Sequence, residues 1–62
     1  MKWSKEVAKQ YPYGYNYFCD EYSIRRDAYY GQFVLRCEGV ELMRGSLKVC
    51  KQFAYQDKQN QM

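Results

Sequence analysis

Cysteine has the widest chemistry of any residue type in this chain. Three cysteines are present, Cys19, Cys37 and Cys50, and the chain has no histidine. A structural zinc site needs four Cys or His ligands, usually in closely spaced pairs, and a reactive thiol needs a neighbouring base or cation. Neither pattern is present. We therefore expect no metal and free, reduced thiols, with at least Cys37 and Cys50 buried as small hydrophobic groups.

The acidic residues do not form a catalytic pair. Asp20 and Glu21 are adjacent, and adjacent side chains on a strand point to opposite faces of a sheet. The sequence has no glycine-rich phosphate loop, and without histidine it lacks the side chain that most often acts as a general base near neutral pH. We expect a protein that is not an enzyme and that holds no cofactor.

Aromatic side chains are the remaining candidates, and their role would be binding. The chain has eight tyrosines, and four of them alternate along residues 11–18, YPYGYNYF. Tyrosine and arginine dominate binding hot spots, because each combines a large contact area with polar groups. The side chains that we expect to contact a partner are Tyr13, Tyr15, Arg25, Arg26, Tyr29 and Tyr30.

The tyrosine run is expected to be an extended connector that becomes a strand near Tyr17. Tyr11 and Tyr17 are predicted to lean on the core. Tyr13 and Tyr15 flank Gly14, where a regular ladder is disfavoured, and are predicted to be exposed. The other interpretation is that the aromatic residues fill the core of a small domain.

Lysines suggest an alternative surface. Lys48, Lys51 and Lys58 recur at helical spacing near the C-terminus and would meet the phosphates of double-stranded nucleic acid without reading its sequence. Lys2, Lys5 and Lys9 could add to that surface. The other interpretation of such a stripe is an ordinary solvated helix face.

The elements that would carry these residues indicate one small α+β domain over residues 1–62, of the order αβββα. Both helices are expected to cover one face of a three-stranded antiparallel sheet. The predicted elements are a helix over 3–11 that ends at Pro12, strands over 18–26, 32–37 and 40–44, a turn over 27–31, a hairpin turn at 38–39, a helix with Ser46 as N-cap, and a fraying tail over 56–62.

The predicted core lies between the last helix and the sheet. Along the helix, apolar residues recur at core-facing spacing. On the strands, period-2 alternation directs one set of side chains inward. The core residues expected are Leu47, Cys50, Phe53 and Ala54 of the helix, with Phe18, Tyr22, Ile24, Phe33, Leu35, Cys37, Val40 and Leu42 of the strands.

The start of the last helix carries a resemblance to a known family. Residues 45–51, GSLKVCK, followed by Ala54, resemble the helix of double-stranded-RNA-binding domains that opens with Gly, Ser and a Lys-Lys-x-Ala-Lys run. Lys48 and Lys51 match two of the lysines that contact phosphates in that family, whereas Leu47 and Cys50 depart from its pattern. The resemblance covers about residues 31–54 and implies the αβββα order.

Size and charge favour a small binding protein. The chain has 62 residues and a net charge of +3, and its charged start is not followed by an apolar leader segment, so we expect a cytoplasmic protein without membrane contact. In style it is similar to small phage and mobile-element accessory proteins, including anti-CRISPR proteins. That likeness implies an inhibitor or modulator that docks on a host protein or nucleoprotein complex, with direct nucleic-acid binding as the alternative. A homodimer formed across a sheet edge is a third interpretation.

Overall fold

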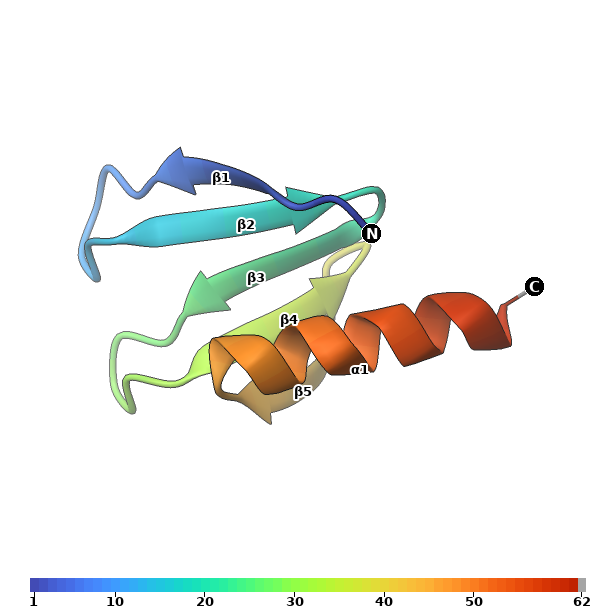
Figure 1. The fold of residues 1–62 in the computed structure, drawn as a ribbon. Helices are drawn as coiled ribbons and strands as arrows, with labels where there is room; N and C mark the ends of the chain where they lie inside the picture. The colour runs from blue at the N-terminus through green and yellow to red at the C-terminus, as the bar shows by residue number, and fades with distance from the viewer. Residues whose placement is uncertain (62) are drawn as a thin grey trace.

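The protein is a five-stranded antiparallel sheet followed by one helix, in the order βββββα. A computed structural model describes residues 1–61. The strands pair in sequence order, and the helix lies across one face of the sheet (Figure 1). The elements are β1 (Ser4–Val7), β2 (Tyr15–Cys19), β3 (Tyr22–Arg26), β4 (Phe33–Cys37), β5 (Val40–Gly45) and α1 (Leu47–Asn60). The predicted αβββα order, with a three-stranded sheet and two helices, is wrong.

The N-terminal segment is a strand where the sequence suggested a helix. β1 pairs with β2 and places Val7 opposite Tyr15. The helix was expected from the apolar residues Trp3, Val7 and Tyr11 at a spacing of four, but these do not share a buried face: Trp3 packs against the core, while Val7 and Tyr11 are exposed. A helix of this length gains little on its own, so pairing with a neighbouring strand decides the conformation.

The predicted strand over residues 18–26 is two strands. A tight turn at Asp20 and Glu21 separates β2 from β3, and Asp20 has a positive φ of 52°. The pairing sets Phe18 opposite Ser23, and Cys19 opposite Tyr22. Phe18 therefore lies on the face away from the helix, whereas the sequence pattern placed it on the same face as Tyr22.

The second half of the chain follows the prediction closely. The β4–β5 hairpin turns at Glu38 and Gly39, both with positive φ (51° and 84°), as a type I′ turn requires. Ser46 caps α1, because its hydroxyl accepts a hydrogen bond from the Val49 N–H at 3.2 Å. The helix continues through Asn60, so residues 56–60 of the predicted fraying tail are helical, and Met62 lies outside the described residues.

The core is a single cluster between α1 and the middle of the sheet. α1 packs on β3, β4 and β5. Around the cluster lie half-buried apolar residues, among them Trp3, Tyr17, Phe33 and Leu42. The fully buried members come from β3, β4 and α1: Tyr22, Ile24, Leu35, Cys50 and Ala54.

Two side chains predicted for this core are exposed. Phe53 is 42% exposed, because it lies at the flank of the buried stripe that Cys50 and Ala54 define. Val40 is 64% exposed beside the β4–β5 turn. The helix thus contacts the sheet through Cys50, Ala54 and Leu47 rather than through Phe53.

One buried polar group anchors the C-terminal half of α1. The Tyr22 hydroxyl donates a hydrogen bond of 2.6 Å to the Asp57 carboxylate, while its ring is 1% exposed. Burial, and secondarily the hydrogen bond to Asp57, raise the pKa of Tyr22 above its ordinary value of 10.0. The helix is therefore tied to the sheet by a polar contact at this end and by apolar packing at its centre.

The two edges of the sheet are β1 and β5. β1 has four residues and carries Lys5 and Glu6. β5 has an irregular register beside Leu35 and Arg36 of β4, and it carries Glu41 and Arg44. The short length of β1, the charged residues on both strands and the irregular register of β5 are features that discourage pairing with another strand.

We predict that Leu35→Ala lowers the free energy of unfolding by about 2–5 kcal/mol, because Leu35 is fully buried. Phe53→Ala, which removes a larger but exposed side chain, should cost only a small fraction of that. Urea denaturation of the two variants and the parent measures the difference. Equal losses for both would contradict the core assignment.

The Tyr22–Asp57 contact predicts a pH dependence of stability. Because the folded-state pKa of Tyr22 is raised, its contribution is fully present below the unfolded pKa of about 10 and is lost as the pH rises through the folded value. We expect Tyr22→Phe to be less stable than the parent near neutral pH by about 1 kcal/mol. The gap should close above about pH 10, as measured by urea denaturation across pH. A gap independent of pH would contradict this.

Candidate functional site

The fold gathers the predicted partner-binding residues at one end of the sheet. In an antiparallel meander, the β1–β2 and β3–β4 connections emerge at the same end (Figure 1). We call this region the tyrosine end. It contains Tyr11 in addition to all of the residues predicted from the sequence, and its members are Tyr11, Tyr13, Tyr15, Arg25, Arg26, Tyr29 and Tyr30.

These side chains are open to solvent. Tyr29 is 92% exposed and Tyr30 is 76% exposed, and the three tyrosines of the first loop and of the start of β2 are exposed as well. Tyr11 was expected to lean on the core, but it lies in solvent and packs edge to face against Tyr13, with ring centroids 6.3 Å apart. Of the two predicted core contacts in the run, Tyr17 alone packs against the core.

Asp27 holds the loop that presents Tyr29 and Tyr30. Its carboxylate accepts hydrogen bonds from the Tyr29 N–H at 2.7 Å and the Tyr30 N–H at 3.4 Å, and it forms an ion pair with Arg44. The backbone closes the same loop, since the Asp27 N–H donates to the Gln32 carbonyl at 2.6 Å. The Tyr29 N–H, followed by the Arg44 guanidinium, keeps the pKa of Asp27 below its ordinary value.

The β1–β2 loop is also closed by the backbone. The N–H of Ala8, which is buried, donates to the Gly14 carbonyl at 2.9 Å. Gly14 has a φ of +134°, which side-chain-bearing residues rarely adopt. Both loops are therefore held in one shape although their tyrosines are exposed, and binding through them would cost less conformational entropy.

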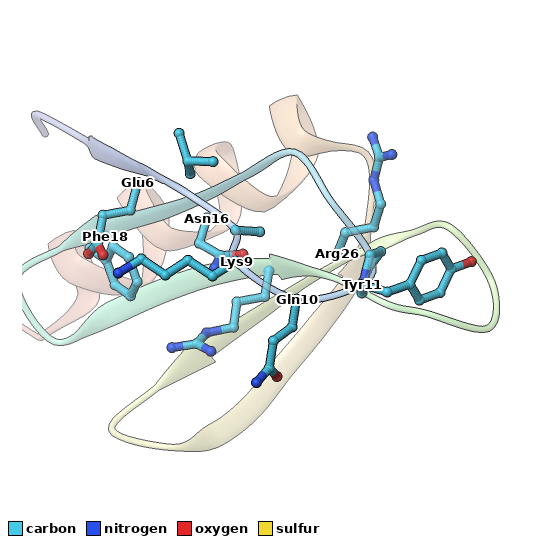
Figure 2. A pocket seen from close by; sticks show the side chains of 11 residues that line it. Glu6, Lys9, Gln10, Tyr11, Asn16, Phe18 and Arg26 are labelled. Carbon is cyan, nitrogen blue, oxygen red and sulfur yellow. The ribbon is translucent and has the colours of Figure 1, made fainter.

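A pocket of about 450 Å³ adjoins the tyrosine end on the sheet face away from α1. Its wall is formed by the β1–β2 loop, and Arg25 and Arg26 line it from β3. Figure 2 shows Tyr11 at one end of the pocket and Glu6 and Phe18 at the other, with Lys9 extended between them. The guanidinium of Arg25 lies 5.7 Å from the Phe18 ring centre. The charged groups that face the pocket are the Glu6 carboxylate and the cations of Lys9 and Arg25, whereas the Arg26 guanidinium lies over Phe33 on the helix side. With two cations to one carboxylate, the lining suits an anionic or carbonyl-bearing group of a partner.

The three lysines of the alternative surface have different environments. Lys58 forms an ion pair with Glu21 at 3.1 Å and lies 3.9 Å from Asp20, which raises the pKa of Lys58. The ammonium of Lys51 lies 5.0 Å from the Tyr17 ring centre, and Lys48 is exposed on the first turn of α1. Lys58 is therefore neutralised locally, and the structure does not bring the three together as one free basic face.

The three cysteine thiols are free. Cys19 and Cys50 are buried, whereas Cys37, which was expected to be buried, is half-buried. Burial raises the pKa of the Cys37 and Cys50 thiols, which lowers their thiolate fraction near neutral pH. Within residues 1–61, no three His, Cys, Asp or Glu side chains lie close enough together to hold a metal ion.

Within the described residues, no helix is both long enough and apolar enough to cross a membrane. Comparisons of the chain with protein-family models, with curated protein sequences and with solved structures found no match. Function is therefore inferred from the exposed side chains and their contacts.

We predict that Asp27→Ala loosens the β3–β4 loop, because it removes the oxygen that accepts the Tyr29 and Tyr30 N–H groups. Hydrogen–deuterium exchange of these two amides should accelerate at least about tenfold, the equivalent of losing roughly 1.4 kcal/mol of local stability. Asp27→Asn keeps a side-chain oxygen that accepts the same bonds and should show a smaller change. Equal exchange in the parent and Asp27→Ala would contradict the role of Asp27.

Proposed function

We propose that the protein is a non-enzymatic binding protein that docks on a protein partner through the tyrosine end. By its likeness to small phage and mobile-element proteins, it would inhibit or modulate a host protein or a nucleoprotein complex. The observation that carries the proposal is the gathering of exposed tyrosines, on two loops that hydrogen bonds close and at the start of β2, beside two exposed arginines at the end of β3.

The exposure of these aromatic side chains distinguishes binding from core filling. The core is already filled by buried residues of β3, β4 and α1, and Tyr29 and Tyr30 contribute nothing to it. Several exposed aromatic side chains at one end of a small protein are typical of an interaction site. Tyrosine suits such a site, since it brings a large, rigid contact area at low cost in rotamer entropy.

Charge indicates the chemistry of the partner surface. Within residues 1–61, the ion pairs involve Arg44 and Lys58, and Arg25 and Arg26 are exposed without a carboxylate partner. With a net charge of +3, the protein would be steered toward an acidic patch. The pocket beside Arg25 is suited to an acidic side chain at the centre of that patch.

A double variant tests the proposal. Partners are captured by affinity purification with nuclease present, and their affinities for the parent and for Tyr29→Ala/Tyr30→Ala are compared. Truncating hot-spot tyrosines typically costs about 2 kcal/mol or more, so we expect binding to weaken at least tenfold with an unchanged melting temperature. Phe53→Ala is the matched control, because it removes an exposed aromatic ring outside the tyrosine end.

Equal weakening by both variants, or none by the tyrosine variant, would contradict docking through the tyrosine end. Tyr13→Ala/Tyr15→Ala tests the other loop in the same way. Capture that disappears with nuclease would favour the alternative, direct binding of double-stranded nucleic acid through Lys48, Lys51 and Lys58. The ion pair between Lys58 and Glu21 counts against that alternative.

A further inference from the structure

A second aromatic surface lies on the helix side of the sheet. α1 packs on β3, β4 and β5, and β1 and β2 extend beyond it, so that their helix-side faces are left open (Figure 1). A pocket of about 550 Å³ lies between the N-terminal segment and α1. We call this surface the aromatic groove, and its residues are Trp3, Lys5, Tyr15, Tyr17, Lys51 and Tyr55.

Strand alternation places these side chains together. The β1–β2 register sets Lys5 opposite Tyr17 and Val7 opposite Tyr15, and opposed residues share a face. Tyr17 marks this face as the helix side, since its ring lies beneath the Lys51 ammonium of α1. Tyr15 and Tyr55 are each 46% exposed, so the groove presents accessible rings from both its floor and its wall.

Cations lie over the rings of this face. The Lys5 ammonium is 4.5 Å from the Tyr15 ring centre, and the Lys51 ammonium is 5.0 Å from that of Tyr17. At the edge of the groove, the Arg26 guanidinium is 5.1 Å from the Phe33 ring centre, and Phe33 packs edge to face with Tyr17. A cation therefore lies over each of these three neighbouring rings on the sheet.

The Asp and Glu carboxylates lie on other surfaces or are held by other partners, and so do not neutralise these cations. Within residues 1–61, Lys5, Arg26 and Lys51 form no ion pair. Glu6 lies on the opposite face of β1 because side chains alternate along a strand, and Glu38 lies in the β4–β5 turn. The remaining five have other partners: Asp20 and Glu21 face Lys58, Asp27 and Glu41 hold Arg44, and Asp57 accepts from Tyr22. The groove is thus aromatic and positively charged.

We infer that the aromatic groove binds single-stranded nucleic acid. Unpaired bases stack on aromatic rings, and a basic groove follows the phosphates. Trp3, Tyr15 and Tyr55 would stack bases, and Lys5 and Lys51 would move from the rings to the phosphates. The bases of a duplex are already stacked on one another, so a duplex would leave the rings unused. The groove shares Tyr15 with the tyrosine end and borders it at Arg26, but its ligand and its other residues differ from those of the proposed protein docking.

The single tryptophan provides a direct readout. Trp3 is the only tryptophan of the chain, and it lines the groove, so base stacking should quench its fluorescence. The probe is an oligothymidylate of about 12 nucleotides, which is within the site size of small single-strand binders. We expect saturable quenching, and at least tenfold weaker binding of a duplex of the same length.

Salt dependence reports the phosphate contacts. With about three contacts, from Lys5, Lys51 and the neighbouring Lys48, a slope of roughly −0.7 per contact predicts about a 20-fold loss of affinity between about 50 and 200 mM salt. Lys5→Ala/Lys51→Ala should weaken binding at least tenfold, and Tyr55→Ala at least about fivefold. Lys9→Ala is the matched control, because Lys9 is an exposed lysine that lines the pocket on the other face, and it should change affinity less than about twofold.

Three results would overturn the inference: no quenching by the oligothymidylate, equal affinity for the duplex, or equal weakening by the Lys9 and Lys5/Lys51 variants. Tighter binding of polyglutamate than of oligothymidylate would overturn it in favour of an acidic peptide. Tyr29→Ala/Tyr30→Ala should leave oligothymidylate binding unchanged. That variant therefore separates a failure of the groove from a failure of the tyrosine end.

Discussion

The close approach of α1 to the middle of the sheet is the contact on which the rest of the structure depends. Cys50 and Ala54 are small and fully buried, and they share one cluster with Ile24 and Leu35. Interiors pack to a fixed density, so small residues on the helix let its backbone lie close to β3 and β4. The direction of α1 is then fixed by Ser46 at its start and by the Tyr22–Asp57 hydrogen bond near its end.

The position of α1 on the sheet decides which parts of the sheet remain uncovered. One helix of 14 residues covers β3, β4 and β5, and the helix side of β1 and β2 is left open. A chain of 62 residues has too little apolar material to cover both halves of the sheet. Half-buried aromatic residues such as Trp3 and Tyr17 lie at the boundary, so one face of the sheet is core over part of its width and open surface over the rest.

Among the charged side chains are two groups, those in ion pairs and those over aromatic rings. Carboxylates near the turns hold Arg44 and Lys58, and these contacts reinforce the β3–β4 loop and the end of the helix. Four other cations lie over aromatic rings: Lys5, Arg25, Arg26 and Lys51. Cation–π pairs at exposed sites contribute only about 0.5–1 kcal/mol each, so a ligand exchanges them at small cost. The mild net charge of the chain therefore understates the local charge at both surfaces.

The structural elements that depend on a few adjacent residues are the ones that the sequence determined by itself. The turn at Glu38 and Gly39 and the Ser46 cap need only a few adjacent residues, and both form as predicted. The residue types of the tyrosine end could be read from the sequence, but whether these tyrosines were exposed or filled the core could not.

Tertiary structure decided the rest. Trp3 and Val7 fit a helix and a strand equally well, and only the presence of β2 as a pairing partner makes this segment β1. Phe53 fits the apolar stripe of the helix, but the face that is buried is set by where small residues meet the sheet. The aromatic groove joins residues of β1, β2 and α1 that are distant in sequence, and no local pattern encodes such a juxtaposition, because it depends on which strands the helix leaves uncovered.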